Sequence, residues 1–399
     1  MTTGPRRGGA GEVFRVFLKL GLTSFGGPVA HLGYFHNEFV RRRGWLDEAR
    51  YGDLVALCQF LPGPASSQVG IAIGLLRAGY LGAAAAWAAF TLPSAIALML
   101  FAYFSPAIGG VLGAGWLHGL KVAAVAVVAL AVLGMARSLA PDRARATLAV
   151  VVAAVVLAVP TALGQIGAIV LGGVAGLALL RSGPMEAHAP LAQPVSRGAA
   201  AAALGIFVAL LAGLPILAAA TTNSGVDMFD AYYRAGSLVF GGGHVVLPLL
   251  QAEVVPQGWV TDDSFLAGYG AAQAVPGPLF AFAAYLGAAS SVAPNGWAGG
   301  LFCLIAIFLP SALLVIGVLP FWEVVRGNPR IRNALMGVNA AVVGLLAAAL
   351  YRPVWTAGIL GPADFAIAAA AFVLLFRWSA PPWLVVILCA AAGAAIDAL

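Results

Sequence analysis

The chain has 399 residues, of which 62% are hydrophobic and only 9% are charged, and its formal net charge is +6. A soluble domain carries about 25% charged residues, so this composition excludes an ordinary soluble globular protein and favours a protein embedded in membrane lipid. The positive charge does not indicate nucleic-acid binding, because the arginines gather at the ends of apolar segments, where they set membrane topology.

The N-terminal part consists of short apolar pieces separated by helix breakers. The pieces cover residues 14–25, 29–40, 51–61 and 65–77, and the breaks are Gly26-Gly27-Pro28 and Pro62-Gly63-Pro64. A helix of about 12 residues is roughly 18 Å long, too short for a hydrocarbon core of about 30 Å. Two half-helices that meet at a break form a re-entrant hairpin, whose irregular backbone must be covered by protein or a watery cavity. We therefore predict two re-entrant hairpins.

Longer apolar segments follow, near residues 80–104, 111–137, 145–160, 163–181 and 199–220. The polar, proline-containing stretch 181–197 is typical of a linker. The pattern then begins again, with two hairpins at about 228–254 and 263–291 and spans near 297–320, 332–351, 358–377 and 381–397. The predicted domains are a first repeat (1–181), a linker with a connecting transmembrane helix (182–225) and a second repeat (226–399).

The recurrence is an internal duplication at an offset of about 215 residues. Each copy holds a Phe-Gly-Gly break, a glutamate, a Gly-Trp pair, a glutamine three residues before a Pro-Gly-Pro break, and a Leu-Pro-Ser triplet. These lie at residues 25–27 and 240–242, 38 and 253, 44–45 and 258–259, 59–64 and 273–278, and 92–94 and 309–311. In a membrane protein, Gly/Pro-interrupted segments at corresponding positions of two halves indicate a transport site.

Loop charges predict the orientation of the two copies. If the N-terminus is cytoplasmic and each hairpin returns to its starting side, arginine-bearing loops fall inside and arginine-free loops fall outside, with Arg352 as the exception. The second copy then begins on the opposite face, and the C-terminus ends outside. The predicted fold is an all-α integral membrane protein with two inverted-topology repeats, each with two broken or re-entrant helical hairpins and about four spanning helices.

Each break presents the N-terminus of a half-helix near the middle of the membrane. The first N–H groups of a helix have no intrahelical acceptor and the helix dipole adds partial positive charge, so such an end binds anions. Glycines let a ligand approach the backbone closely. The alternative is that Gly and Pro only shape packing, but duplication at corresponding positions favours a site. The predicted substrate-binding residues are Ser24, Phe25, Gly26, Gly27, Pro28, Gln59, Pro62, Gly63, Pro64, Ser66, Ser67, Phe240, Gly241, Gly242, Gln273, Pro276, Gly277 and Pro278.

Four further side chains are candidates for proton coupling. They are His31, Glu38, His244 and Glu253. Histidines and intramembrane carboxylates often take part in proton relays. The alternatives are a packed, hydrogen-bonded histidine and, for Glu38, a salt bridge with the arginines at 41–43. The glutamines Gln59 and Gln273 likewise either donate to an oxyanion or bond the broken helix.

The remaining polar residues suggest no chemistry. Lys121 is expected to snorkel from its apolar run to an interface, in preference to facing a cavity. His118 and His188 are expected to be solvated loop residues. The three cysteines (Cys58, Cys303 and Cys389) stand alone, which favours buried small hydrophobes and predicts no metal and no cofactor.

The motifs together resemble the chromate ion transporter family. The runs 20–48, 56–71 and 90–98 resemble its first domain, and the runs 236–255, 258–260, 272–278 and 308–314 resemble its second, so the chain is similar to the long two-domain members. The resemblance implies a bacterial inner-membrane protein that moves chromate outward, driven by the membrane potential or a proton gradient. The second copy has Gly243 in place of the proline, and Leu279-Phe280 in place of the two serines, so equal contributions from the two halves are not implied.

Alternatives remain at the level of the sequence. Sulfate has nearly the charge and shape of chromate, so a carrier of sulfate or another oxyanion is the second hypothesis. A membrane-embedded enzyme is a third, although no HExxH, GxSxG or Walker A motif is found. A structural or receptor-like membrane protein would not explain the duplicated breaks. Expected partners are the anion and membrane lipid, without nucleic acid, and the oligomeric state is open, with a homodimer among the options.

Overall fold

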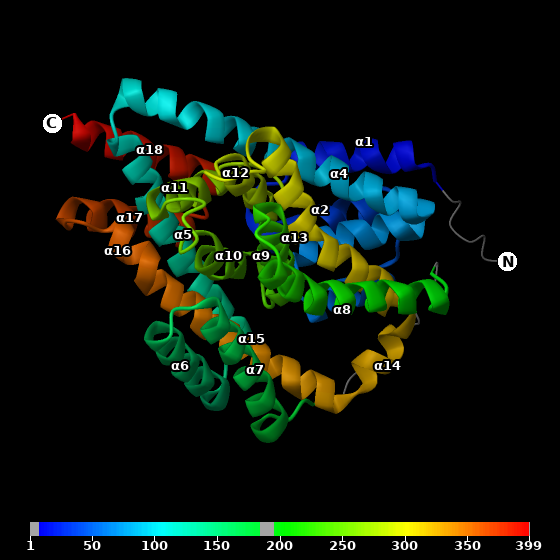
Figure 1. The fold of residues 1–399 in the computed structure, drawn as a ribbon. Helices are drawn as coiled ribbons and strands as arrows, with labels where there is room; N and C mark the ends of the chain where they lie inside the picture. The colour runs from blue at the N-terminus through cyan, green and yellow to red at the C-terminus, as the bar shows by residue number, and fades with distance from the viewer. Residues whose placement is uncertain (1–7, 184–194, 399) are drawn as a thin grey trace.

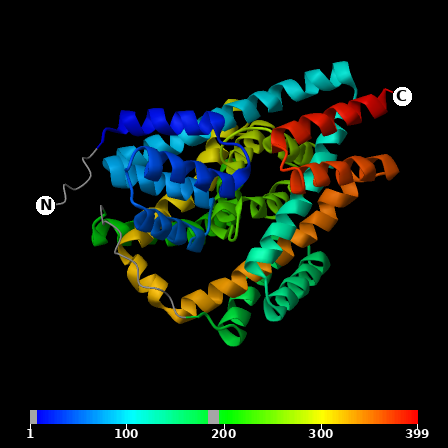
Figure 2. The same ribbon diagram turned by 180° about the vertical axis from the view of Figure 1, so that it is seen from behind.

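The computed structural model describes residues 8–183 and 195–398. Within these ranges every regular element is a helix. Helix α1 (Ala10–Thr23) lies at one side of the molecule and helix α18 (Pro382–Asp397) at the other, in both views (Figures 1 and 2). The short, broken helices occupy the middle. The prediction of an all-α membrane protein is confirmed.

The first half opens with the two broken hairpins that the sequence predicts. Helix α1 is followed by α2 (Gly27–Phe35), which continues as the π-helical turn η1 (His36–Arg42). Helix α3 (Glu48–Phe60) leads through the Pro-Gly-Pro break into α4 (Ala65–Leu112). Helix α4 leaves helical geometry at Ala78 and Gly79, so its first section is the predicted half-helix and the rest is the predicted span.

The other helices of this half are α5 (Gly115–Leu139), α6 (Arg143–Ala158) and α7 (Ala162–Leu179). Helix α8 (Arg197–Ala220) then connects to the second half. Most of its surface is exposed, as expected for a helix that faces lipid along much of its length.

The second half repeats this order of elements. Its two hairpins and the helix that follows them are α9 (Ser224–Leu238), η2 (Gly243–Val245), α10 (Val246–Val254), α11 (Asp262–Ala272), η3 (Leu279–Ala281), α12 (Phe282–Ala288) and α13 (Gly296–Val318). The remaining elements are η4 (Leu319–Phe321), α14 (Trp322–Gly327), α15 (Pro329–Ala349), η5 (Leu350–Trp355), α16 (Thr356–Gly358), α17 (Pro362–Phe376) and α18.

Six helical stretches of the described chain are long and apolar enough to cross a membrane. They include α4, α5, α7, α8, α13 and α15. Three of the predicted spans form short helices, because α6, α17 and α18 have 16, 15 and 16 residues. At 1.5 Å per residue each is about 24 Å long, less than a hydrocarbon core of about 30 Å. The structure therefore agrees with a multi-pass membrane protein. Helix length alone, however, does not support all of the membrane spans that the sequence predicts.

The halves exchange their long central helices. Helix α5 of the first half packs against α17 and α18 of the second, and α15 of the second half packs against α6 and α7 of the first (Figures 1 and 2). Glycines allow this close approach: a Cβ on Gly119 would touch the carbonyl of Cys389, and one on Gly337 would touch that of Gly172. Small residues at helix contacts are what tight packing in lipid requires, since burial from water does not drive it there.

Corresponding glycines also mark the helix crossings inside each half. A Cβ on Gly21 of α1 would lie 2.6 Å from the carbonyl oxygen of Ala89 on α4. In the second half, a Cβ on Gly236 of α9 would meet the carbonyl of Ile307 on α13. The two halves thus share equivalent contacts. Whether they are inverted relative to a membrane stays a prediction.

Candidate functional site

The four predicted breaks meet in the middle of the molecule. The backbone N–H of Gly63 donates to the carbonyl oxygen of Val239 at 2.6 Å, and the N–H of Gly277 donates to that of Ser24 at 2.9 Å. Each Pro-Gly-Pro break is therefore joined to the Phe-Gly-Gly break of the other half. Pro28 also approaches Gly243, where a Cβ would lie 3.6 Å from the proline Cγ. These contacts satisfy backbone groups that would otherwise be orphaned away from water.

Glycine is required at the breaks by backbone conformation. Six break glycines have positive φ angles, a region that L side chains rarely adopt. They are Gly26 (98°), Gly27 (77°), Gly63 (124°), Gly241 (74°), Gly242 (148°) and Gly277 (98°). The sequence pattern of duplicated glycines is thus explained by chain geometry at the same points where the halves touch.

Each Pro-Gly-Pro break also packs against the Leu-Pro-Ser triplet of the other half. A Cβ on Gly63 would collide with the hydroxyl of Ser311, and one on Gly277 would lie 2.9 Å from the hydroxyl of Ser94. Ser311 is fully buried and its hydroxyl oxygen has no partner. In the sequence these triplets are part of the duplication and predict no chemistry. The structure therefore adds Ser94 and Ser311 to the candidate site residues.

Two helix N-termini at the breaks lack a capping side chain. Helix α2 begins at Gly27 with Pro28 in its first turn, and helix α4 begins directly after Pro64; neither N-cap residue makes a side-chain hydrogen bond. In the second half the corresponding segments begin instead with the 3-10 turns η2 and η3. The first N–H groups of α2 and α4 are therefore without a side-chain cap, as the anion-site prediction needs.

A cavity of about 160 Å³ lies at this meeting point and is lined by both halves. The first half contributes Gly26, Gly27 and Pro28 together with apolar residues of α5. The second half contributes His244, Gln273 and Gly277 among others. His244 bonds the hydroxyl of Tyr269 through Nδ1 at 2.8 Å. The cavity combines a mostly apolar wall with a few polar groups, as small-ligand sites do.

The matched glutamines have different surroundings. Gln273 is half-buried, lines the cavity and places its Nε2 3.5 Å from the carbonyl oxygen of Tyr269. Gln59 is exposed and does not line that cavity. The duplication at sequence level therefore does not give the two amides equivalent environments.

The two phenylalanines of the Phe-Gly-Gly breaks also differ in their surroundings. Phe25 lies beside Trp383, with ring centroids 6.4 Å apart, and Phe240 is half-buried.

Buried hydroxyls gather around the first-half breaks. His31 is buried and contacts the hydroxyl of Ser66 at 3.3 Å and the carbonyl oxygen of Ser24 at 3.2 Å. The hydroxyls of Ser24 and Ser67 are buried and have no partner. Gln68, which the sequence analysis passed over, is fully buried, donates to the Pro62 carbonyl at 2.6 Å and leaves its own side-chain oxygen unpartnered. The first-half breaks therefore carry both satisfied polar groups and buried polar atoms without a protein partner.

The two glutamates lie away from the cavity, in ion pairs. Glu38 accepts hydrogen bonds from Arg42 at 2.9 Å and Arg43 at 2.6 Å. Glu253 lies 3.2 Å from Arg234. For Glu38 this is the salt-bridge arrangement that the sequence analysis held as the alternative to proton transfer.

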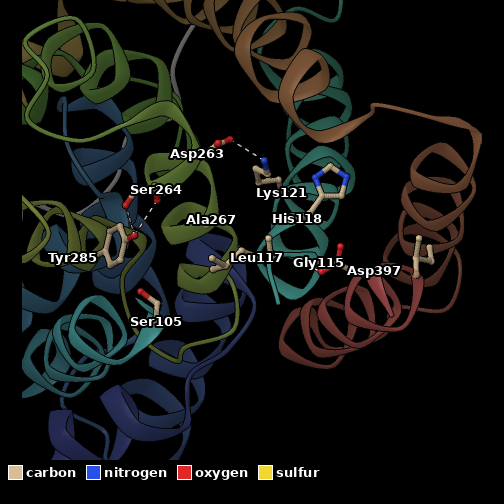
Figure 3. Close-up of a pocket in the computed structure, with 13 residues that line it drawn as sticks. Ser105, Gly115, Leu117, His118, Lys121, Asp263, Ser264, Ala267, Tyr285 and Asp397 are labelled. Carbon is tan, nitrogen blue, oxygen red and sulfur yellow. Dashed lines mark hydrogen bonds and ion pairs between the residues drawn. The ribbon is translucent and has the colours of Figure 1, made fainter. Parts of the chain in front are cut away.

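A second, larger cavity of about 660 Å³ opens between α5, α11 and α18 (Figure 3). Lys121 points into it and pairs with Asp263 at 2.8 Å, so the expectation that this lysine snorkels to an interface is wrong. His118 is half-buried on α5 and pairs with Asp364 at 2.9 Å, which also corrects its expected place in a solvated loop. His188 lies outside the described residues. Helices α5, α11 and α18 also contribute residues to the small central cavity, and the larger cavity is called the vestibule.

The cysteines lie where the sequence predicts. All three are free and buried in apolar surroundings, with Cys303 fully enclosed. Among the described residues no group of three or more His, Cys, Asp or Glu side chains is placed to hold a metal ion. The polar groups at the meeting point of the four breaks are backbone N–H groups, serine hydroxyls, glutamine side-chain amides and histidine rings.

Comparison with known proteins agrees with this architecture. A family model described as "Chromate transporter" matches residues 11–177 and 226–394. A "Chromate transport protein" of Pseudomonas aeruginosa is 29% identical over 95% of this chain and 90% of its own length. A relative from Cupriavidus metallidurans with the same description is 28% identical over 85% of this chain and 81% of its own, and a "Probable chromate transport protein" of Synechococcus elongatus is 27% identical over 85% and 83%.

No solved structure matches the chain. The family match covers most of the chain in two parts, one on each side of α8, and it points to a transporter rather than an enzyme. On this evidence, the chain belongs to the chromate transporter family.

Proposed function

We propose that the protein is a secondary transporter that exports chromate across the bacterial inner membrane and thereby gives chromate resistance. The membrane potential or a proton gradient would drive it. The observation that carries the proposal is the match to the chromate transporter family, together with the relatives from Pseudomonas aeruginosa and Cupriavidus metallidurans that are described as chromate transport proteins. Sulfate, which is nearly alike in charge and shape, is the second candidate substrate.

The central cavity supports this proposal chemically. A tetrahedral dianion that leaves water needs many donors, because an unpaired charge in a low-dielectric site costs several kcal/mol or more. The uncapped N-termini of α2 and α4 offer backbone N–H groups without adding a countercharge. The positive-φ glycines leave no side chain between the anion and that backbone.

Side chains around the cavity complete the proposed donor set. Gln273 lines it directly. Ser24, Ser67 and Ser311 do not line it, but they lie at the breaks or in contact with them, and their buried hydroxyls have no partner. A hydroxyl rotates freely, so each can turn its O–H toward an oxyanion. We place the anion between the half-helix starts at Pro28 and Pro64 and their counterparts near Gly242 and Pro276.

If protons are coupled to transport, the histidines are the better candidates. His31 contacts the Ser24 break and His244 lines the cavity, so the charge of either would act directly on a bound anion. Glu38 and Glu253 are already in ion pairs with arginines at some distance from the cavity, and we do not extend the coupling proposal to them. The N-terminus is proposed to be cytoplasmic and the C-terminus external.

Chromate tolerance of intact cells tests the function. Cells that express the chain should accumulate less radiolabelled chromate and grow at higher chromate concentration than cells with an empty vector, and excess sulfate should compete. Unchanged chromate content, with the protein confirmed in the membrane, would remove chromate as the substrate. Sulfate movement without chromate movement would favour the second candidate.

A further inference from the structure

A third cavity of about 230 Å³ lies on the opposite side of the breaks from the vestibule, between α3, α14 and α15. Its charged residues are Asp53, Arg326 and Arg332, and its aromatic residues are Phe60 and Trp322. Phe60 is the last residue of α3, two positions before Pro62, so the cavity adjoins the first Pro-Gly-Pro break. By the predicted topology this is the cytoplasmic side, from which an exported anion must enter.

A buried ion pair occupies this cavity. Arg326 donates to the Asp53 carboxylate at 2.7 Å, and the two side chains are only 8% and 4% exposed. Arg326 also contacts Glu323, which is 41% exposed. A buried charge pair of this kind is a poor source of stability, because desolvation offsets most of the attraction. Its presence beside the proposed pathway therefore calls for another role.

Several polar atoms of the residues that line this cavity have no hydrogen-bond partner. The Nε of Arg332 and the indole N–H of Trp322 are buried without hydrogen-bond partners. The second carboxylate oxygen of Asp53 is also buried and unpartnered. Two guanidinium groups and an indole N–H therefore line the same cavity as the carboxylate. Such a set suits an oxyanion, since guanidinium recognises its oxygens with paired donors.

The vestibule on the other side lacks this arrangement. Helix α11 corresponds to α3 in the duplication, and the cavity-lining residue of α11 near the position of Asp53 is the uncharged Ala267. The charged pair that bridges the vestibule, Lys121 with Asp263, has its carboxylate 79% exposed. The larger cavity thus has an exposed carboxylate, at Asp263, whereas the smaller one has a buried carboxylate, at Asp53.

We propose that the cavity of Asp53, Arg326, Trp322 and Arg332 is a cytoplasmic entry site for the oxyanion, in which the Asp53 carboxylate occupies the place of the substrate. This inference rests on the proposed function. Arg332 already donates through one terminal nitrogen to the Gly183 carbonyl oxygen, so its unpartnered donor is Nε. An arriving dianion takes Arg326 from Asp53 and gains the Nε–H of Arg332 and the indole N–H of Trp322. The displaced carboxylate repels the anion, so the site releases it toward the breaks instead of trapping it.

To test this inference, charged residues of the full chain are replaced by uncharged ones. Initial uptake of radiolabelled sulfate and chromate is then measured in inverted vesicles, where the cytoplasmic face is outside. Asp53→Asn removes the internal competitor and should lower KM about tenfold. Arg326→Gln should raise KM at least tenfold, and Arg332→Gln, which lies outside the ion pair, should raise it severalfold. Asp142→Asn and Arg145→Gln, which alter an exposed ion pair elsewhere, are matched controls and should leave KM unchanged.

The double variant Asp53→Asn with Arg326→Gln separates a ligand role from a structural one. If the pair only stabilises the fold, both single variants lower the melting temperature, and the double variant restores both the melting temperature and KM; that result overturns the entry site. A double variant that is stable but keeps the high KM of Arg326→Gln supports it. If the wild-type protein transports the anion and all variants have the same KM, the entry site is refuted and the proposed function stands. If the wild-type protein takes up neither anion, both the entry site and the proposed function are refuted.

Discussion

The N–H of Gly63 bonds the carbonyl oxygen of Val239 at 2.6 Å, across the boundary between the two halves of the chain. The reciprocal bond, from Gly277 to Ser24, joins the other pair of breaks. Because each half completes the broken backbone of the other, neither hairpin pair has its polar groups satisfied alone. A rocking motion of one half against the other would have to exchange these bonds, which places any moving part next to the proposed anion.

Gly63 should be the least replaceable glycine of the breaks. Its φ of 124° disfavours any side chain, and a Cβ would also strike Ser311 and Gln68. Gly27 is restrained by φ alone, since nothing lies within 4 Å of its would-be Cβ. We expect Gly63→Ala to reduce chromate flux more than tenfold and Gly27→Ala to reduce it less. Gly33→Ala, on α2 with open space around it, is the control. Normal flux in Gly63→Ala would argue against a rigid role for the break.

The matched glutamines should differ in effect. Gln273 lines the central cavity, so Gln273→Ala should raise KM for chromate about tenfold, the loss of one charge-assisted hydrogen bond of about 1.5 kcal/mol. Gln59 is exposed, so Gln59→Ala should change KM less than about twofold, in contrast to the equal roles that the sequence suggests. Saturation kinetics of the two variants side by side decide the matter. A larger effect at Gln59 would mean that the anion binds elsewhere.

Transport should not depend on the thiols. Cys58, Cys303 and Cys389 are free and buried, and none of them lines the central cavity. Replacing all three by Ala should leave chromate flux within about twofold of wild type, with some loss of thermal stability because the removed sulfur atoms leave small cavities. A stable, membrane-inserted triple variant without flux would show that thiol chemistry takes part.

The cysteine-free protein also allows a test of topology. Single cysteines introduced near positions 225 and 262 should react with a membrane-impermeant maleimide from outside the cell, whereas a cysteine in the arginine-rich loop at 41–43 should react only from the cytoplasm. The expectation follows from the alternation of arginine-bearing loops. Labelling of positions 225 and 262 from the cytoplasm alone would rule out the inverted arrangement.

Much of this architecture could be predicted because helix breakers in apolar sequence have few interpretations. Gly26-Gly27-Pro28 and its repeat had to interrupt helices, and the structure ends α1 and begins α2 at that point. Which breaks would pair with each other could not be read from the sequence. That pairing depends on how α5 and α15 cross between the halves, and helix exchange leaves no local signal.

Side-chain partners were the weakest part of the sequence prediction. A lysine in an apolar run usually reaches an interface, and only the packing of α11 beside α5 brings Asp263 to Lys121. One helix start was similarly misjudged: the predicted span begins at residue 358, whereas α17 begins at Pro362, after Gly361. The ion pair of Asp53 with Arg326 joins residues 273 positions apart, beyond any spacing rule.

We propose that the breaks form the path of an oxyanion. The decisive experiment measures uptake of radiolabelled chromate into inverted membrane vesicles, with and without an imposed membrane potential or proton gradient. We predict saturable uptake that rises with the imposed gradient, is inhibited by sulfate and is lost in Gly63→Ala while Gly33→Ala behaves as wild type. Uptake that is equal in vesicles with and without the protein, or that persists unchanged in Gly63→Ala, would contradict the account.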